Sequence, residues 1–291
     1  GGRVLAPIGG GMSGVIQPRV SWEAYCALPG TRVSHLKELR RSPQHYQYML
    51  ANPIETTAMR LGTASHTAVL EPERFESTYT FWTRRTDSGR LAPRTGKHWD
   101  AFVAENSGRL VLSDAEAETA LTIQRAIRST PAAMRYLGSG DPEVTMQWDI
   151  DGHACKGRMD WLTHEHGRPI VVGLKTARDA RPFLFGSQAA KLAYHLQWAY
   201  YFDGFRKICG DEPRMVEIVV ENKPPHAVAV YNIPADIIGQ GRDEYLEMLA
   251  LLQDCQQKNE WPGPVTEEQD LTLPSWVYES SDDLTDLGLE A

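Results

Sequence analysis

An acidic residue and a lysine lie near the ends of two consecutive apolar segments. Asp160 follows Cys-Lys-Gly-Arg-Met, and Lys175 ends the run Pro169-Ile-Val-Val-Gly-Leu-Lys. If both segments are neighbouring strands, Asp160 approaches Gly173, and alternation puts Lys175 on the same face as Gly173. A carboxylate is costly to bury unless it is paired or binds a metal ion. Asp160 therefore either binds a divalent cation or forms a buried ion pair with Lys175, and the spacing alone leaves both interpretations open.

Four further side chains are candidates for the same chemistry. Glu143 begins the preceding strand and is either a second oxygen ligand for Mg2+ or a solvated acid at a strand start. His66 lies four residues after Gly62 on a predicted helix, so it is either a ligand or a histidine satisfied within the core. Gln197 and Tyr201 are four residues apart on the helix that follows the lysine strand, where packing is the alternative to a role in the site.

The periodicity of apolar residues predicts the elements that must position these side chains. Ser113 and Glu116 form a capping box at a helix start, and Asp151-Gly152 indicates a hairpin turn between two strands. Residues 82–98 are polar and basic, which favours a loop. We predict helices over 34–50 with a break at Ser42-Pro43, 56–70, 113–128, 187–206 and 235–257, and strands over 143–150, 153–163, 169–175, 214–221 and 227–233. This order predicts an α/β fold with a mixed central sheet flanked by helices.

Composition limits the class of protein and its compartment. The 291 residues are 42% hydrophobic and 23% charged, as expected of a globular protein with a substantial core. No apolar run is long enough for a membrane helix, and the four scattered cysteines favour a reducing cytoplasm over a zinc site or disulfides. We expect residues 1–11 to be a leader outside the fold, residues 12–262 to form one domain, and residues 263–291 to be an acidic tail.

The net charge of −8 argues against a general nucleic-acid binder, because affinity for phosphate comes from lysine and arginine. Positive charge is nevertheless concentrated in one segment near the middle of the chain. This basic segment is a candidate contact for DNA phosphates, which would position DNA without reading its sequence. It consists of Arg84, Arg85, Arg90, Arg94 and Lys97.

Taken together, several motifs resemble those of the RecE-type exonucleases, the exodeoxyribonuclease VIII-like members of the PD-(D/E)xK nuclease superfamily. The resemblance runs from about residue 20 to residue 255, and its joint pattern is specific although each piece alone is weak. Its motifs are Ser34-His-Leu-Lys37 with Ser42-Pro-Gln-His-Tyr46, Leu61-Gly-Thr-Ala-Ser-His66-Thr-Ala-Val-Leu-Glu-Pro72, Glu143-Val-Thr, Cys155-Lys-Gly-Arg-Met-Asp160, Leu174-Lys-Thr-Ala-Arg-Asp-Ala180, and Tyr194-His-Leu-Gln197-Trp-Ala-Tyr-Tyr201-Phe-Asp-Gly204.

The resemblance implies a restriction-endonuclease-like core and a role for each candidate. His66, Glu143 and Asp160 would bind Mg2+, for which Mn2+ substitutes, and Lys175 would orient or activate the attacking water. Metal ions make hydroxide near neutral pH and stabilise the leaving oxygen in such hydrolyses. Gln197 and Tyr201 would support the site or touch DNA, and Arg158 would be a further DNA contact.

The resemblance also implies the partners and the setting of the reaction. The substrate would be the ends of double-stranded DNA, digested in the 5′–3′ direction. A homo-oligomeric ring would thread the DNA, and a single-strand annealing (RecT-like) protein would be the partner in phage-type recombination. The location would be the cytoplasm of a bacterial or phage-infected cell.

The chain departs from the family pattern at Gly173, where that pattern has an aspartate two residues before the lysine. Three explanations are open: an inactivating change made deliberately, a natural loss in a protein that binds DNA ends without cutting them, or a gap filled by water or Glu165. If a ligand is simply missing, Gly173→Asp should raise cleavage of linear duplex DNA. A non-cleaving end-binding protein would gain nothing from this substitution.

Overall fold

The computed structural model describes residues 14–54 and 56–274, so the predicted leader and the end of the acidic tail lie outside the described residues. The strands are β1 (Gly14–Gln17), β2 (Tyr79–Phe81), β3 (Leu110–Leu112), β4 (Asp141–Ile150), β5 (His153–Glu165), β6 (Arg168–Ala177), β7 (Arg214–Glu221) and β8 (Val228–Asn232). The helices are α1 (Trp22–Ala27), α2 (Val33–Leu36), the 3-10 helix η1 (Lys37–Arg40), α3 (Pro43–Ala51), α4 (Thr57–Leu70), α5 (Pro72–Thr78), α6 (Lys97–Glu105), α7 (Asp114–Arg128), α8 (Pro131–Leu137), α9 (Pro182–Lys191), α10 (Tyr194–Cys209) and α11 (Ala235–Lys258).

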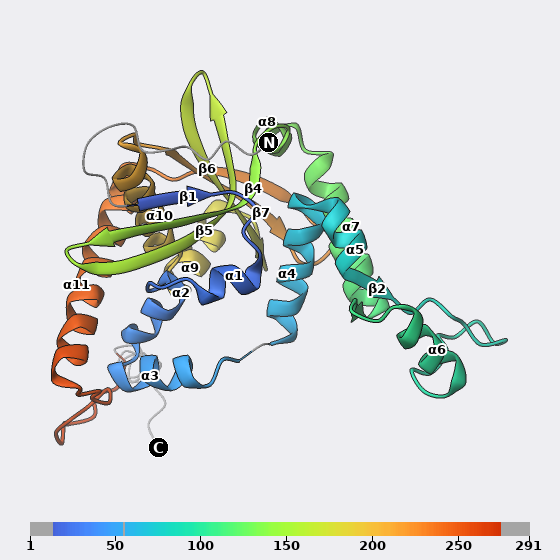
Figure 1. The fold of residues 1–291 in the computed structure, drawn as a ribbon, viewed down its shortest axis with the longest axis horizontal. Coiled ribbons are helices and arrows are strands. Elements are labelled where there is room, and N and C mark those ends of the chain that lie inside the picture. The colour runs from blue at the N-terminus through green and yellow to red at the C-terminus, as the bar shows by residue number, and fades with distance from the viewer. Residues whose placement is uncertain (1–13, 55, 275–291) are drawn as a thin grey trace, which may run out of the picture.

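A six-stranded sheet with the order β1-β4-β5-β6-β7-β8 forms the centre of the molecule (Figure 1). Strands β6 and β7 are parallel because α9 and α10 lie between them in sequence, and the other neighbours in this sheet are antiparallel. The predicted α/β fold with a mixed central sheet flanked by helices is confirmed.

Alternation along β6 assigns its side chains to two different cores. Ile170, Val172 and Leu174 pack with residues of α4, α7 and α8, whereas Val171 and Ala177 belong to the core that contains α10 and α11. Because successive residues of a strand point to opposite faces, Gly173 and Lys175 face α10. The sheet therefore presents the lysine to the helix that follows it in sequence.

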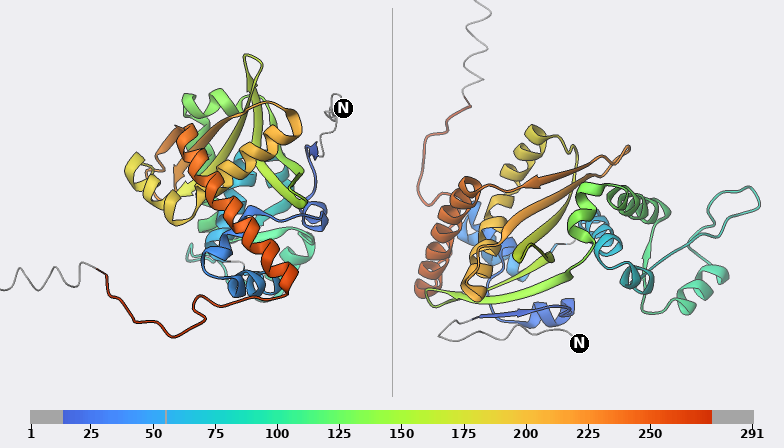
Figure 2. Two further views of the ribbon diagram at one scale, coloured as in Figure 1. Left: turned by 90° about the vertical axis from the view of Figure 1, so that its left-hand side faces the viewer. Right: turned by 90° about the horizontal axis from the view of Figure 1, so that it is seen from above.

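The segment between α4 and α7 projects from the body of the molecule as an arm (Figures 1 and 2). It contains α5, α6 and a two-stranded parallel pair of β2 and β3. The predicted loop over 82–98 is largely irregular, but Arg85 and Leu91 form an isolated bridge and α6 already begins at Lys97. The basic segment lies in this arm.

Local sequence signals at turns and caps are confirmed, while one predicted helix is wrong. Asp151 and Gly152 have φ values of 51° and 84°, as the predicted hairpin requires. Ser113 and Glu116 form both bonds of the capping box. The predicted helix over 187–206 is two helices, because Ala193 has a left-handed backbone (φ 53°) that ends α9 and begins α10. Within the described residues, no helix is long and apolar enough to cross a membrane.

Candidate active site

Asp160 lies where β5 and β6 separate. The register of these antiparallel strands extends to the pair Trp161 and Val172, and beyond it Asp160 Oδ2 accepts a hydrogen bond from the backbone N–H of Leu174 at 2.8 Å. Where β5 and β6 separate, which we call the fork of the sheet, the Asp160 side chain thus takes the place of a backbone carbonyl as the acceptor. This bond holds the carboxylate of Asp160 beside the end of β6, as the sequence predicted.

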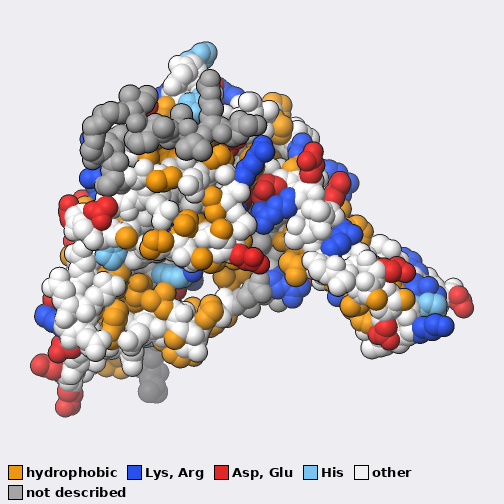
Figure 3. All heavy atoms as spheres, in the orientation of Figure 1, with side chains coloured by type: hydrophobic (Ala, Val, Ile, Leu, Met, Phe, Trp, Pro, Cys, Tyr) orange, Lys and Arg blue, Asp and Glu red, His pale blue; other side chains and the backbone are white. Residues whose placement is uncertain are grey.

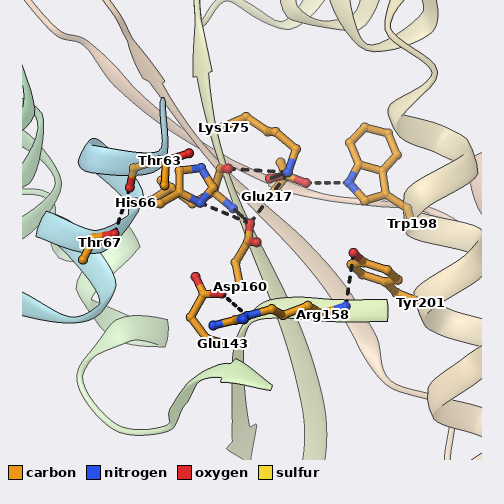
Figure 4. A network of polar contacts seen from close by, with 11 residues as sticks. Thr63, His66, Thr67, Glu143, Arg158, Asp160, Lys175, Trp198, Tyr201 and Glu217 are labelled. Carbon is orange, nitrogen blue, oxygen red and sulfur yellow. Dashed lines mark hydrogen bonds and ion pairs between the residues drawn. The ribbon is translucent and has the colours of Figure 1, made fainter. Parts of the chain in front are cut away.

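Lys175 contacts two carboxylates (Figure 4). Its Nζ lies 3.7 Å from Asp160 Oδ2 and 3.7 Å from Glu217 Oε1. Burial by itself lowers the pKa of Lys175, but the charges of Glu217 and Asp160 outweigh it and raise the pKa above its ordinary value. The predicted contact between Asp160 and Lys175 is therefore present, but as part of a cluster with a second acid.

Sequence reasoning missed Glu217, which lies on β7 directly beside Gly173 in the parallel register. Its side chain is 1% exposed, and the indole N–H of Trp198 donates to its Oε2 at 2.5 Å. Its Oε1 has no hydrogen-bond partner among the described residues, and burial raises the pKa of this carboxyl group. One signal could have identified it: a lone acid inside the otherwise apolar run Met215-Val-Glu-Ile-Val-Val is costly to bury without a function.

His66 of α4 approaches Asp160 from the side opposite Trp198 and Tyr201 (Figure 4). Its Nδ1 lies 4.0 Å from Asp160 Oδ2, and its side chain is 24% exposed. Burial lowers the pKa of His66, although the charge of Asp160 opposes this effect. A neutral imidazole is the form that binds metal ions.

Glu143 faces Asp160 across β4 and β5 but bonds to an arginine. The register pairs on either side place the two acids opposite each other, and Glu143 has a left-handed φ of 53° that interrupts the ladder. Arg158 Nε donates to Glu143 Oε2 at 2.5 Å. Burial, followed by the charge of Asp160, raises the pKa of Glu143 to about 7. The carboxylate predicted as a ligand is thus engaged by Arg158 in this conformation.

The side chain of Arg158 is 8% exposed. Contacts within the protein therefore compete with its predicted contact to DNA. Besides the bond to Glu143, its guanidinium lies 5.8 Å from the ring of Trp22 and 5.9 Å from that of Tyr25. These contacts hold the side chain between β4 and α1, where it screens the charge of Glu143.

Helix α10 supplies the wall of the pocket that faces the sheet. Tyr201 Oη accepts a hydrogen bond from the Arg158 backbone N–H at 3.4 Å, and Gln197 lies one turn earlier. Trp198, next to Gln197, is the residue that bonds to Glu217. The helix was predicted to contribute Gln197 and Tyr201; the structure adds Trp198.

A second lysine lies near Lys175. The ammonium groups of Lys37 and Lys175 are 5.4 and 5.5 Å from the ring centre of Tyr194. Burial, and then repulsion by Lys175, lowers the pKa of Lys37 to about 7, so its charge near neutral pH is partial. Lys175 is therefore the charged amine beside the two acids, and Lys37 adds only a partial charge.

The donor set suits a hard divalent cation. The carboxylate oxygens of Asp160 and Glu217 match the ligand preferences of Mg2+ and Mn2+, and the buried Oε1 of Glu217 lacks a hydrogen bond among the described residues. Two ligand atoms about 2.1 Å from one ion can be up to about 4.2 Å apart, and the separation of His66 Nδ1 and Asp160 Oδ2 is 4.0 Å. In residues 14–54 and 56–274, no three His, Cys, Asp or Glu side chains lie close enough together to form a metal-binding group in this conformation. Lys175 lies 3.7 Å from both acids.

Other candidates lie outside this pocket. Glu165, proposed to fill the gap at Gly173, is instead paired with Arg135 at 2.5 Å and lies 3.9 Å from Arg214 at the far end of β5. Glu165 therefore does not fill the gap, and the carboxyl group of Glu217 lies beside Gly173 instead. In the basic segment, Arg94 donates to the Leu112 carbonyl at 2.7 Å. The remaining members of the segment are exposed on the arm and are not part of the pocket.

Comparison with known proteins assigns the fold. The search of curated proteins gives no match. A "Putative exonuclease" from Eubacterium rectale superposes with a TM-score of 0.60 at 14% identity, covering 94% of this chain and 99% of its own. SSO0001, with a TM-score of 0.36 at 12% identity (78% of this chain, 81% of its own), and VC1899 from Vibrio cholerae, with 0.22 at 10% identity (84% and 58%), are too distant to carry an argument.

The family match covers most of the fold and the whole pocket. Residues 32–271 match the family described as a PDDEXK-like domain of unknown function (DUF3799). This span contains His66, Asp160, Lys175 and Glu217, and at the coarser level it agrees with the resemblance to PD-(D/E)xK nucleases. The chain belongs to this PDDEXK-like family.

Proposed function

We propose that the protein is a metal-dependent nuclease that hydrolyses phosphodiester bonds of DNA. The observation that supports this most strongly is the convergence of Asp160, Lys175 and Glu217 at the fork of the sheet, with His66 opposite. A bound divalent cation would supply hydroxide near neutral pH and charge stabilisation at the phosphate. Among the described residues, Asp160, Glu217 and His66 are those that would hold it.

The chain's own residues have separate tasks in this proposal. Lys175 is held charged by its two acids, so it orients the attacking water through hydrogen bonds and offsets the charge that develops on the phosphate oxygens. Trp198 fixes Glu217, and the Leu174 N–H fixes Asp160, so both carboxylates are oriented before substrate arrives. Such preorganisation is the main source of electrostatic catalysis.

The resemblance to RecE-type exonucleases supports a finer proposal. We infer attack on the ends of linear double-stranded DNA, 5′–3′ digestion with Mg2+, a ring-shaped homo-oligomer and an annealing protein as partner. These properties concern surfaces and assemblies beyond the single chain, and each needs its own assay.

The direct test is digestion of end-labelled linear duplex DNA with and without Mg2+, using covalently closed circular DNA as the control. We expect nucleotides to be released from the linear substrate only when Mg2+ is present, and we expect Asp160→Asn to abolish release. Binding of linear DNA without any cleavage, with either Mg2+ or Mn2+, would instead identify a non-cleaving end-binding protein.

A further inference from the structure

We propose that Glu217 supplies the metal-binding carboxylate that Gly173 lacks, so that this ligand has moved from β6 to the neighbouring strand β7. The inference rests on the proposed metal-dependent function and names one residue of its site. It also explains why a glycine stands two residues before Lys175.

The register of β6 and β7 makes such an exchange geometrically possible. Gly173 and Glu217 are directly paired in a parallel ladder, so their side-chain positions project from the same face of the sheet. A side chain on β7 must cross the spacing of about 4.8 Å between strands to reach the position above Gly173. Glutamate has the length to do so, and its carboxyl atoms are the nearest neighbours of a Cβ position built on Gly173.

The carboxyl group of Glu217 occupies the space that a side chain at position 173 would need. A Cβ atom on Gly173 would lie 2.5 Å from Oε1, 2.6 Å from Oε2 and 2.8 Å from Cδ of Glu217. Real Cβ atoms do not approach other atoms this closely, so a side chain at 173 would require the carboxyl group of Glu217 to leave its observed position. Glycine at 173 is the residue that leaves room for the carboxylate from β7.

The bonding of Glu217 leaves one oxygen directed at the pocket. Trp198 fixes Oε2, whereas the buried Oε1 lacks a hydrogen bond among the described residues and lies 3.7 Å from Lys175 Nζ. A fully buried carboxylate oxygen without a hydrogen bond is costly, and a metal ion placed beside Lys175 would offset that cost. Asp160 and Lys175 border the same space, where the proposed ion would lie.

This placement reverses one expectation from the sequence. If the ligand were simply missing, Gly173→Asp would raise activity; with Glu217 in place, the same substitution forces two carboxyl groups into one volume. In Gly173→Asp alone, the two buried carboxyl groups should compete for one position so that neither is held there, which should weaken both metal binding and folding. Combined with Glu217→Ala, Gly173→Asp should return the carboxylate to β6 without the clash.

The experiment is calorimetric titration of the purified full chain with Mn2+, with DNA cleavage measured in parallel. We expect Glu217→Gln to weaken Mn2+ binding by at least about 10-fold, the lower end of the range for groups that support metal ligands. Gly173→Asp should also bind weakly, and Gly173→Asp with Glu217→Ala should recover most of the affinity. The matched control is Glu221→Gln, four residues along the same strand, where the carboxylate accepts from the Ala180 N–H and does not lie beside Gly173.

The outcomes separate this inference from the proposed function. Wild-type binding and cleavage that persist unchanged in Glu217→Gln would overturn the role of Glu217 while leaving the nuclease proposal intact. A wild-type chain that neither binds Mn2+ nor cleaves DNA would overturn both. If Glu217→Gln fails to fold, the double variant decides the question, because Mn2+ binding restored there supports the exchange and its absence contradicts it.

Discussion

At the scale of single residues, substitution can distinguish the role of Lys175 from that of the two acids beside it. Lys175→Met keeps most of the aliphatic volume but removes the charge that lies 3.7 Å from both Asp160 and Glu217. We expect cleavage to fall by about 100-fold or more, the usual cost of removing one preorganised electrostatic group. Mn2+ binding should be kept or tightened, since the ammonium no longer competes for the carboxylates.

Parallel measurement of turnover on linear DNA and of Mn2+ affinity tests this split. Lys191→Met, on the exposed end of α9, is the control and should change neither quantity. Loss of both metal binding and cleavage in Lys175→Met would mean that the lysine mainly stabilises the fold. Unchanged cleavage would remove Lys175 from the chemistry.

At the scale of elements, α2 contains a histidine that is held neutral. Arg32 donates to His35 Nε2 at 2.6 Å, and a guanidinium cannot accept, so this nitrogen is an acceptor. Burial, and then the charges of Arg32 and Lys156, lowers the pKa of His35 to about 4. Protonation would break the bond and place two positive charges together.

This histidine should make the stability of the protein depend on pH. The folded pKa lies below the unfolded value of about 6.5, so the unfolded state binds more protons between these values. The stabilisation is complete above about pH 6.5 and is lost progressively as the pH falls toward 4. Because His35 is partly exposed, we expect a loss of about 1 kcal/mol between pH 7 and pH 5.

Urea unfolding of the wild type and His35→Gln at pH 7 and pH 5 measures this contribution. The variant should lose less stability than the wild type over this interval, because its side chain does not titrate. His98→Gln, exposed on α6, is the control and should behave as the wild type. An equal loss in the His35→Gln variant would show that other groups cause the pH dependence.

The sequence predicted elements wherever local signals decide the structure. The hairpin at Asp151-Gly152, the capping box at Ser113 and the strand before Lys175 depend on neighbours in sequence, and all three are present. The break at Ala193 was missed because alanine favours helix, and tertiary packing of two separate helices overrides that preference. Likewise, Asp160 and Lys175 were found because their strands are consecutive.

Glu217 could not be placed from sequence because its neighbour is distant along the chain. Strands β6 and β7 are joined by α9 and α10, and the register between them is set by how these helices pack. A shift of one residue would turn Glu217 to the other face of the sheet. Only the folded structure shows that Glu217, and not Glu165, lies beside Gly173.

At the scale of the whole molecule, the net charge of −8 makes the location of positive charge important. The arm that carries the exposed arginines projects away from the central sheet (Figure 1), and Figure 3 shows Lys and Arg side chains on it. We expect removal of three of them, in Arg84→Ala with Arg85→Ala and Arg90→Ala, to weaken DNA binding. For every arginine that pairs with a DNA phosphate, its removal should make the slope of log affinity against log salt shallower by about 0.9.

Fluorescence anisotropy with duplex DNA across a salt series measures this effect. The control removes the same charge elsewhere, in Arg206→Ala with Lys207→Ala and Lys258→Ala, at the ends of α10 and α11. An equal decrease in both triple variants would indicate that only net charge matters. A decrease confined to the arm variant would identify the arm as a DNA contact.

Our central claim is that a divalent cation binds at the fork of the sheet, through Asp160 on β5 and Glu217 on β7. This claim is tested most directly by a crystal structure of the protein with Mn2+, using anomalous scattering to locate the ion. We predict an anomalous peak about 2.1 Å from carboxylate oxygens of both residues, with Lys175 displaced toward the solvent side of the pocket. No peak at the fork, with Lys175 still 3.7 Å from both carboxylates, would contradict it.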